Sequence, residues 1–387
     1  MIYHGLIITG TSGAGKTTLT RNLIESGAFE QVRAVITRQP RKDDAGEYEY
    51  ISSEEFQTRL KLNQLVINTQ YRDQYYGIST SAVNAVKKKG KIPILVITPA
   101  SCREYEMRKT KPFTFLSCFI DAEDGELDKR LIARDGEITD TVKDSRNKDR
   151  TFKDQCLYYI RNISVEKTSE LIQNLWELRV SGGILSKRLI ELMLSSNMLL
   201  TNANYDNVKS ASYDLSLGDE YYYKGKIQRL NADNPFLVIE PYDYVIATSI
   251  ELANFPRDIS GRFDLAVSLF CQGVILSNGP CVDPGFRGRL FCLLFNTSNA
   301  PVHLKRGQHY ATLELQKLIE PTIPYSGKYQ DKQSIVDYLP SNALQGGINE
   351  LKKEVESLKR GNQLLQTAIA GGIAILLAVL SVLLVIK

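Results

Sequence analysis

A short stretch near the start of the chain has the residue types and spacing of a phosphate-binding loop. It reads GTSGAGKT from Gly10 to Thr17 and lies between an apolar run and a helix-forming run. Glycines let backbone N–H groups point into such a loop, and the helix that follows adds partial positive charge. Lys16 is then placed to reach the β- and γ-phosphates of ATP, and Thr17 to hold Mg²⁺. The residues predicted to bind ATP and its phosphates are Gly10, Gly13, Gly15, Lys16, Thr17 and Thr18.

Residues suited to a second phosphate follow in ITRQPRKDDAGEYEYIS and later in QYYGIS. Together with SGAGKTTL, these motifs resemble the guanylate kinase family over roughly residues 5–175. The resemblance implies an acceptor-nucleotide site, with arginine forks that match phosphate oxygens, at Arg38, Arg41, Tyr48, Gln70 and Tyr76. It also implies a lid whose arginines, Arg130, Arg134 and Arg146, stabilise the negative charge of the transferred phosphoryl group. Together with Lys16, these arginines are the predicted catalytic residues of this domain.

Some positions depart from the guanylate kinase pattern where that family binds guanine. Gln70 stands where the family has a glutamate, Ile78 replaces a serine or threonine, and Val96 and Thr98 replace strand aspartates. A carboxylate pairs with the N1–H and amino group of guanine, whereas a glutamine offers both a donor and an acceptor. We therefore expect an acceptor other than GMP, either another (deoxy)nucleoside monophosphate or, for a binding-only domain, a ligand that is not phosphorylated.

The sequence pattern changes from Ile184 onward, where short strand-like runs alternate with turn residues. The motifs SASYDLSLGDEYYY and CVDPGFRGRLFCLLFN resemble the dCTP deaminase and dUTPase family over Gly183 to about Ser334. The resemblance implies a nucleotide site, with the catalytic Asp283 orienting an attacking water. Its candidate ligands are Arg262, Asp283, Phe286, Lys328, Tyr329 and Gln333.

The chemistry of this second domain depends on a few substitutions. Leu293 takes the place of the deaminase glutamate, and leucine cannot transfer a proton. Phe263 replaces a phosphate-binding serine, and the neighbouring Asp264 adds negative charge. The run CLLFN is dUTPase-like. We predict a dUTP diphosphatase-like domain rather than a dCTP deaminase, and the alternative is a trimerising scaffold that has lost its site.

The chain finishes in an uncharged, proline-free run from Thr367 to Ile386. A helix of this length spans the ~30 Å hydrocarbon core of a bilayer. Residues 367–387 are therefore predicted to cross a membrane, and the positively charged residues before them place the N-terminal domains in the cytoplasm. Residues 343–366 are predicted to form a coiled-coil stalk, with a heptad seam at Ile348, Leu351, Val355, Leu358, Asn362 and Leu365.

The elements that must position these residues define the architecture. Apolar runs such as LIITG, IPILVIT and FTFLSCFI alternate with helical stretches, which predicts an α/β P-loop kinase domain with a parallel sheet over residues 1–178. A mainly-β, dUTPase-like domain follows over residues 184–335. A short coiled coil and one transmembrane helix complete the chain.

Composition limits the remaining function classes. The formal net charge is +4 over 387 residues, so no nucleic-acid partner is expected. Six scattered cysteines and three histidines do not form a zinc signature. The expected ligands are nucleotides, with Mg²⁺ as cofactor and ATP as phosphoryl donor. A homotrimer is expected because the second domain's family assembles as trimers.

Two functions fit these features. The first is a membrane-anchored protein of deoxynucleotide metabolism, with an ATP-dependent nucleoside monophosphate kinase joined to a dUTPase-like domain. The alternative is a membrane-bound nucleotide sensor or effector, for example in host–virus conflict, whose second domain has lost its catalytic residues.

Overall fold

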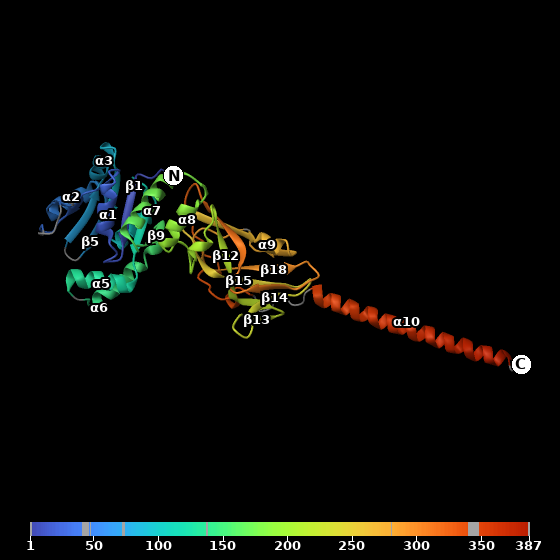
Figure 1. The fold of residues 1–387 in the computed structure, drawn as a ribbon. Coiled ribbons are helices and arrows are strands. Elements are labelled where there is room, and N and C mark those ends of the chain that lie inside the picture. The colour runs from blue at the N-terminus through green and yellow to red at the C-terminus, as the bar shows by residue number, and fades with distance from the viewer. Residues whose placement is uncertain are drawn as a thin grey trace.

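The computed structural model describes residues 2–40, 46, 48–71, 74–136, 138–279, 281–339 and 348–385. Figure 1 shows an α/β domain at the N-terminal end, a mainly-β domain beside it and a long helix that projects from the second domain. The predicted fold class is confirmed for both domains.

The first domain is built on a parallel sheet with a crossover on each side of its first strand. Every strand pair in it is parallel. Such strands are covered by helices on both faces and read as apolar runs, which is why GLIITG and FLSCFID are fully buried. The strand order is β2 (Phe29–Gln31), β7 (Ile92–Val96), β1 (Gly5–Gly10), β8 (Phe115–Asp121) and β9 (Tyr158–Arg161).

Helices cover this sheet, and two of them, α5 and α6, form the lid that carries the predicted lid arginines. Helix α7 buries Leu171, Ile172 and Leu175 in the main core, and it packs beside α1 and the first helix of the second domain. The helical elements of this domain, apart from the one on the small sheet, are α1 (Lys16–Glu25), α3 (Thr80–Lys88), α4 (Pro99–Glu106), α5 (Asp124–Asp135), α6 (Asp140–Arg150), η1 (Lys153–Gln155), α7 (Val165–Glu177) and η2 (Leu178–Val180).

A smaller sheet carries the predicted acceptor residues. Helix α2 (Ser53–Lys61) packs on it through Phe56, whose ring stacks on Tyr75 with centroids 5.2 Å apart. Ser52 caps α2 by accepting a hydrogen bond from the Glu55 N–H. The strand order is β4 (Tyr48–Tyr50), β3 (Ala34–Ile36), β6 (Gln74–Ser79) and β5 (Leu65–Tyr71).

The second domain is formed by antiparallel strands. Along β18, alternate residues are buried in the core and half-exposed, as expected for a strand with one buried face. The large sheet follows the path β10 (Gly183–Ile184), β20 (His309–Lys317), β12 (Ser212–Tyr223), β15 (Tyr244–Asn254), β18 (Arg287–Asn296) and β17 (Val274–Ser277). Off this path, β11 (Leu199–Thr201) pairs with β15, β13 (Lys226–Arg229) with β12 and β16 (Ile259–Leu265) with β20, while β14 (Phe236–Ile239) and β19 (Val302–Lys305) pair separately.

Short helices complete this domain. Helix α8 (Lys187–Ser195) is strongly amphipathic and packs its apolar face into the core shared with α7. The 3₁₀ turn η4 (Ile335–Asp337) is held by a capping box at Ser334, and its Ile335 is fully buried. The other helical elements are α9 (Val267–Phe270) and η3 (Tyr205–Asn207).

A buried polar cluster joins the two domains. The Tyr158 hydroxyl on β9 donates to Asp258 Oδ2 of the second domain, and the Lys317 ammonium lies 3.2 Å from the same carboxylate. All three side chains are buried. Burial raises the pKa of Asp258, and the positive charge of Lys317 offsets part of this increase. The Arg161 N–H also donates to the Ser196 carbonyl across the junction, at 3.0 Å.

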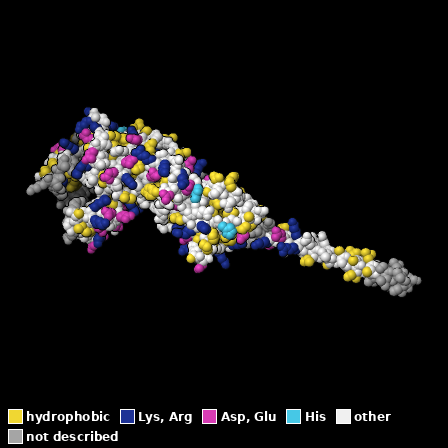
Figure 2. Space-filling view, viewed as in Figure 1, with side chains coloured by type: hydrophobic (Ala, Val, Ile, Leu, Met, Phe, Trp, Pro, Cys, Tyr) yellow, Lys and Arg dark blue, Asp and Glu magenta, His cyan; other side chains and the backbone are white. Residues whose placement is uncertain are grey.

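Helix α10 (Ile348–Val385) is a single continuous helix that points away from the second domain. Its 38 residues make a helix about 57 Å long. The described side chains from 353 to 378 are exposed, and Figure 2 shows Lys and Arg near its start and hydrophobic side chains farther along. Within the described residues, this is the one helix long and apolar enough to cross a membrane. The predicted seam residues Val355, Leu358 and Leu365 are exposed, while Ile348 and Leu351 lie outside the described side chains.

Candidate functional site

The phosphate-binding loop has backbone geometry that requires glycine. Gly10 has a φ of 135°, and a Cβ there would overlap the Ile120 carbonyl oxygen. Gly15 has a φ of 85°, and a Cβ there would lie 2.8 Å from the Asn162 side-chain amide. The loop is therefore pressed against β8 on one side and held by Asn162 on the other, which fixes the start of α1.

The start of α1 presents groups that favour an anion. Its first turn contains no acidic residue, and its N-cap, Gly15, makes no side-chain capping bond. The Lys16 ammonium folds back over the loop and donates to the carbonyl oxygens of Gly10, at 2.9 Å, and Thr11, at 2.7 Å. Thr17 and Thr18 are exposed at the same helix end. This arrangement fits a polyphosphate, which would take over the loop N–H groups and the ammonium.

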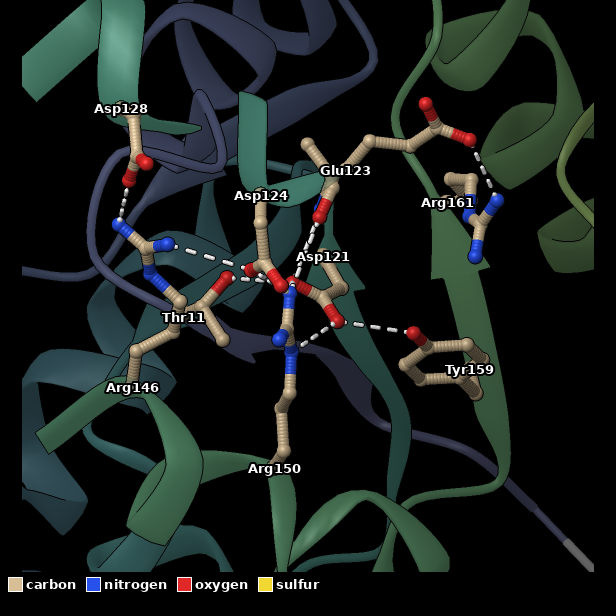
Figure 3. Close-up of polar contacts among 10 residues, drawn as sticks. Thr11, Asp121, Glu123, Asp124, Asp128, Arg146, Arg150, Tyr159 and Arg161 are labelled. Atoms are coloured by element: carbon tan, nitrogen blue, oxygen red, sulfur yellow. Dashed lines mark hydrogen bonds and ion pairs between the residues drawn. The ribbon is translucent and has the colours of Figure 1, made fainter. Parts of the chain in front are cut away.

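Asp121, at the end of β8, is a site residue that the sequence analysis missed. Its carboxylate accepts hydrogen bonds from the hydroxyls of Thr11 and Tyr159, each at 2.8 Å, and from Arg150 Nε at 2.9 Å (Figure 3). Burial by itself would raise the pKa of Asp121, but the bonds from Arg150, Thr11 and Tyr159 outweigh burial and lower it. The signal was an acidic residue closing an otherwise apolar strand, FLSCFID, that pairs with β1.

The predicted lid arginines occupy different surroundings. The nearest Arg130 guanidinium nitrogen would lie 3.7 Å from a Cβ placed on Gly15, so this side chain adjoins the loop. Arg146 is buried and pairs with Asp128 at 2.7 Å and Asp124 at 3.2 Å. The side chain of Arg134 lies outside the described side chains.

Two further lid residues were missed by the sequence analysis. Arg150 on α6 bridges Asp121 and Asp124, the latter at 2.8 Å, so the lid helix is tied to the end of β8 (Figure 3). Asp149, its neighbour, lies close enough to Lys16 for the two charges to interact. Burial raises the pKa of Asp149, against a smaller lowering by Lys16.

The acceptor side lies on the small sheet. The Arg38 guanidinium donates to the Gln39 carbonyl at 2.9 Å and lies 5.2 Å from the centre of the Tyr48 ring. Tyr76 lies opposite Thr69 in the β5–β6 pair, and Gln70 lies opposite Tyr75. Arg41 lies outside the described residues. Tyr50, whose ring centre is 6.0 Å from the Arg38 guanidinium, joins this group and was not predicted.

The second domain contains a pocket of about 190 Å³ beside Asp283. It is lined by the predicted residues Arg262, Asp283, Phe286 and Tyr329. Asp283 is exposed, and its Oδ1 accepts from Cys281 Sγ at 3.5 Å. Other described residues that line the pocket were not predicted from the sequence, among them Asn278, Cys281, Arg289, Phe291, Tyr325 and Tyr338.

Aromatic rings form one wall of this pocket. The ring centres of Phe291 and Tyr338 are 4.5 Å apart, and those of Tyr329 and Tyr338 are 5.5 Å apart. The Lys328 ammonium lies over the Tyr329 ring, 4.8 Å from its centre, outside the pocket lining. Gln333 lines a different cavity. Leu293 on β18 lies opposite Ile246 and Ser277 and is not among the described residues that line the pocket.

Comparison with known proteins assigns both domains. The guanylate kinase family model matches residues 3–178, and the dCTP deaminase-like family model matches residues 184–318. Guanylate kinase from Helicobacter pylori is 32% identical over 179 residues, which are 44% of this chain and 84% of that protein. dCTP deaminase from Pyrococcus horikoshii is 32% identical over 144 residues, 37% of this chain and 91% of that protein. This chain belongs to both families.

The chain is thus a guanylate kinase domain fused to a dCTP deaminase-like domain, two domains of nucleotide metabolism. A dUMP-forming dCTP deaminase from Persephonella marina is also similar to the second domain. It is 28% identical over 163 residues, covering 38% of this chain and 91% of its own length.

Proposed function

We propose that the guanylate kinase domain transfers a phosphoryl group from ATP to a nucleoside monophosphate other than GMP. The observation that carries this proposal is the loop at the start of α1, where the strained glycines and Lys16 form a polyphosphate cradle. In this proposal, the γ-phosphate displaces the loop carbonyls as partners of the Lys16 ammonium. Phosphoryl transfer depends mainly on such positioning and charge stabilisation.

Mg²⁺ would be held through Thr17, at the exposed start of α1, and through the phosphates themselves. When bound, it supplies positive charge that offsets the phosphate oxygens. Among the described residues no cluster of three or more His, Cys, Asp or Glu side chains is suited to a metal ion, which agrees with an ion held largely by the nucleotide. Asp121 positions the loop by accepting the Thr11 hydroxyl.

The lid arginines would supply further charge to the transferred group. Arg130 adjoins Gly15, whereas Arg146 and Arg150 are held by carboxylates of β8 and α5. We infer that ATP binding draws Arg146 away from Asp124 and Asp128, because the phosphates offer a stronger negative charge. The lid would then close as the substrates bind.

The acceptor would bind on the small sheet, with its phosphate on Arg38 and the Tyr48 ring beside it. Gln70 would contact the base. Its amide donates and accepts, and therefore cannot offer guanine the two acceptors that a carboxylate provides. This difference is the basis for expecting a monophosphate other than GMP.

The test is turnover by the full chain in detergent micelles. MgATP is supplied with AMP, GMP, CMP, UMP, dCMP, dUMP or dTMP, and ADP formation is measured. We expect ADP formation with at least one monophosphate at a kcat/KM at least tenfold above that for GMP. Preference for GMP, or no ADP formation with any acceptor, would overturn the proposal.

For the dCTP deaminase-like domain we propose hydrolysis of dUTP or a related nucleotide rather than deamination. Asp283 is exposed in a pocket where it can orient a water, while Leu293 cannot transfer a proton. The Persephonella marina relative, as a dUMP-forming deaminase, links this family to release of a monophosphate. The test is product analysis with dCTP and dUTP. Ammonia release from dCTP would contradict it, and formation of dUMP and pyrophosphate from dUTP would support it.

A second candidate for this domain is nucleotide binding without chemistry, as in a membrane-bound sensor. The observations in its favour are Phe263, which lines the pocket where the family has a phosphate-binding serine, and Leu293, which cannot transfer a proton. Binding of dUTP or dCTP without any product would favour this candidate.

We further propose that the chain is a homotrimer anchored in a membrane by α10. The dCTP deaminase-like family is typically trimeric, and Val267, Phe270 and Ile275 are exposed apolar side chains that a second copy could cover. The exposed apolar length of α10 also needs lipid or partner helices to cover it.

Two measurements test the assembly and the anchor. Light scattering on the full chain in micelles should give the mass of three chains, and liposome flotation should carry the full chain upward. A chain truncated after residue 339 should stay at the bottom of the gradient. A monomer would contradict the trimer, and flotation of the truncated chain would contradict the anchor.

A further inference from the structure

A cavity of about 600 Å³ lies between the two domains. Its kinase side is formed by η1 and β9, and its other side by the turn after β15, the start of β18 and residues 324–333. It is separate from the loop at α1, whose residues do not line it, and it falls in the size range of small-molecule sites, which often lie at domain interfaces.

The charged residues in this cavity favour an anion. Of the described residues that line it, four are cationic and two are acidic: Lys153, Arg161, Arg257 and Arg287, with Asp154 and Asp331. Both acidic residues are engaged by Arg287, which lies 2.8 Å from Asp331 and 2.9 Å from Asp154. Arg161 pairs with Glu123, which lies outside the cavity lining, at 2.9 Å.

Two cations remain available to a ligand. Neither Lys153 nor Arg257 lies within 4.0 Å of a carboxylate among the residues that the structure describes, although Asp331, whose pKa is lowered chiefly by its bond from Arg287, also interacts with the Lys153 charge. The Lys153 ammonium lies 5.3 Å from the centre of the Tyr159 ring, and Arg257 Nε donates to the Thr322 carbonyl at 3.3 Å. Both side chains are half-buried, one from each domain. A phosphate between them would join the two domains through charge-assisted hydrogen bonds.

Aromatic side chains supply the apolar part of the site. Tyr159, Phe255 and Tyr325 all line the cavity, which gives flat surfaces of the kind on which a base or sugar can pack. Basic groups beside aromatic surfaces in a cavity of this size match a nucleoside phosphate better than an inorganic ion.

The same aromatic residues connect this cavity with both described sites. The Tyr159 hydroxyl donates to Asp121, which also accepts from Thr11 of the phosphate-binding loop (Figure 3). Burial, followed by the Asp121 charge, raises the pKa of Tyr159, so its hydroxyl keeps the donated proton. On the other side, Tyr325 lines both this cavity and the Asp283 pocket and packs on Phe286 with ring centres 5.5 Å apart.

We propose that the interdomain cavity is a further nucleotide site, which binds a nucleoside phosphate with its phosphate between Lys153 and Arg257 and its base against the aromatic side chains. A ligand there contacts both domains and fixes their junction. Such a ligand also contacts Tyr159, which donates to Asp121 beside the phosphate-binding loop, and Tyr325, which lines the Asp283 pocket.

The test separates this site from the other two. The full chain in detergent micelles carries Lys16→Ala, Arg38→Ala and Arg262→Ala, which weaken the kinase and Asp283 sites. Calorimetric titration then uses AMP, GMP, CMP, UMP and dTMP, each beside its nucleoside. We expect at least one monophosphate to bind with about one site per chain, and its nucleoside to bind at least tenfold more weakly.

Charge reversal locates the site. Arg257→Glu in this background should weaken binding at least tenfold, and Lys153→Gln should weaken it severalfold. Arg306→Glu is the matched control, because it reverses an exposed arginine in the turn between β19 and β20 and should leave binding within twofold. Thermal unfolding checks that each variant is folded. If Arg257→Glu is unfolded, Lys153→Gln alone tests the location of the site.

Absence of monophosphate binding in the triple variant would overturn the proposal. So would binding that neither cavity substitution changes, or binding that Arg306→Glu weakens equally. Because the test uses a chain with an inactivated kinase site, its outcome is independent of whether the kinase proposal holds.

Discussion

The kinase site and the Asp283 pocket are built in different ways. Around the phosphate-binding loop, backbone strain at Gly10 and Gly15 and the bond from Thr11 to Asp121 fix the cradle before any ligand binds. Around Asp283, an exposed carboxylate faces a wall of aromatic side chains that come from separate segments. A site of the first kind tolerates few changes, whereas one of the second kind can exchange its chemistry and keep its fold.

The substitutions in the two sites follow this difference. In the kinase domain the departures from the family pattern, such as Gln70, lie where the base is expected to bind, and the phosphate cradle is intact. In the second domain the departures, Phe263 and Leu293, lie where phosphate binding and proton transfer are expected. We therefore expect altered specificity in the first domain and altered chemistry in the second.

The largest expected effect comes from the phosphate cradle. Lys16→Ala should lower the kcat for ADP formation about 10³-fold, because it removes the ammonium expected at the γ-phosphate. Lys129→Ala, an exposed lysine on α5, is the matched control and should retain activity. Retention of kinase activity in Lys16→Ala would place the phosphate elsewhere.

A smaller loss is expected in the second domain. Asp283→Asn should reduce dUMP formation from dUTP about 10²-fold, since an amide orients a water but does not accept its proton as a carboxylate does. Asp233→Asn, on an exposed loop, is the control. Unchanged dUMP formation in Asp283→Asn would contradict this expectation, because a residue other than Asp283 would then activate the water.

A change of specificity should be smaller again. Gln70→Glu should raise the kcat/KM for GMP about tenfold, because a carboxylate can accept from both the N1–H and the amino group of guanine. Gln64→Glu adds the same charge at an exposed turn and should have no such effect. An unchanged preference would show that Gln70 does not contact the base.

The smallest effect concerns stability. Asp121→Asn should lower stability at neutral pH by about 1–2 kcal/mol, because it weakens bonds from Arg150 and Tyr159. The pKa of Asp121 is below its ordinary 3.8 in the folded chain, so its contribution is present above pH 3.8 and is lost as pH falls through the lower folded value. The difference in melting temperature between wild type and Asp121→Asn should therefore shrink in acid.

Asp140→Asn is the control for this pH dependence, since Asp140 is almost fully exposed on α6. It should follow the wild type at every pH. A gap between wild type and Asp121→Asn that stays constant down to pH 2 would mean that the carboxylate charge does not stabilise the loop.

The sequence predicted what depends on local pattern. Glycine spacing identified the phosphate-binding loop because the strained backbone at Gly10 and Gly15 tolerates no other residue, and apolar runs identified the strands of the parallel sheet. Family resemblance identified Asp283 and Phe286, which do line one pocket.

The sequence did not predict groups that meet only through tertiary structure. Asp121 reaches Thr11 because β1 and β8 are neighbours in the sheet, although 110 residues separate them in the chain. Tyr338 reaches the Asp283 pocket from a 3₁₀ turn near the end of the domain. The interdomain cavity depends on how β9 docks on the second domain, and neither domain's motifs contain that information.

We infer that the first domain keeps phosphoryl transfer and that the second has lost deamination. One measurement tests both halves on the same sample. The full chain in micelles is incubated with MgATP, the best monophosphate acceptor and dCTP, and ADP and ammonia are measured together. We expect steady ADP formation with no ammonia above the level without protein. Ammonia release from dCTP, or the absence of ADP formation, would contradict it.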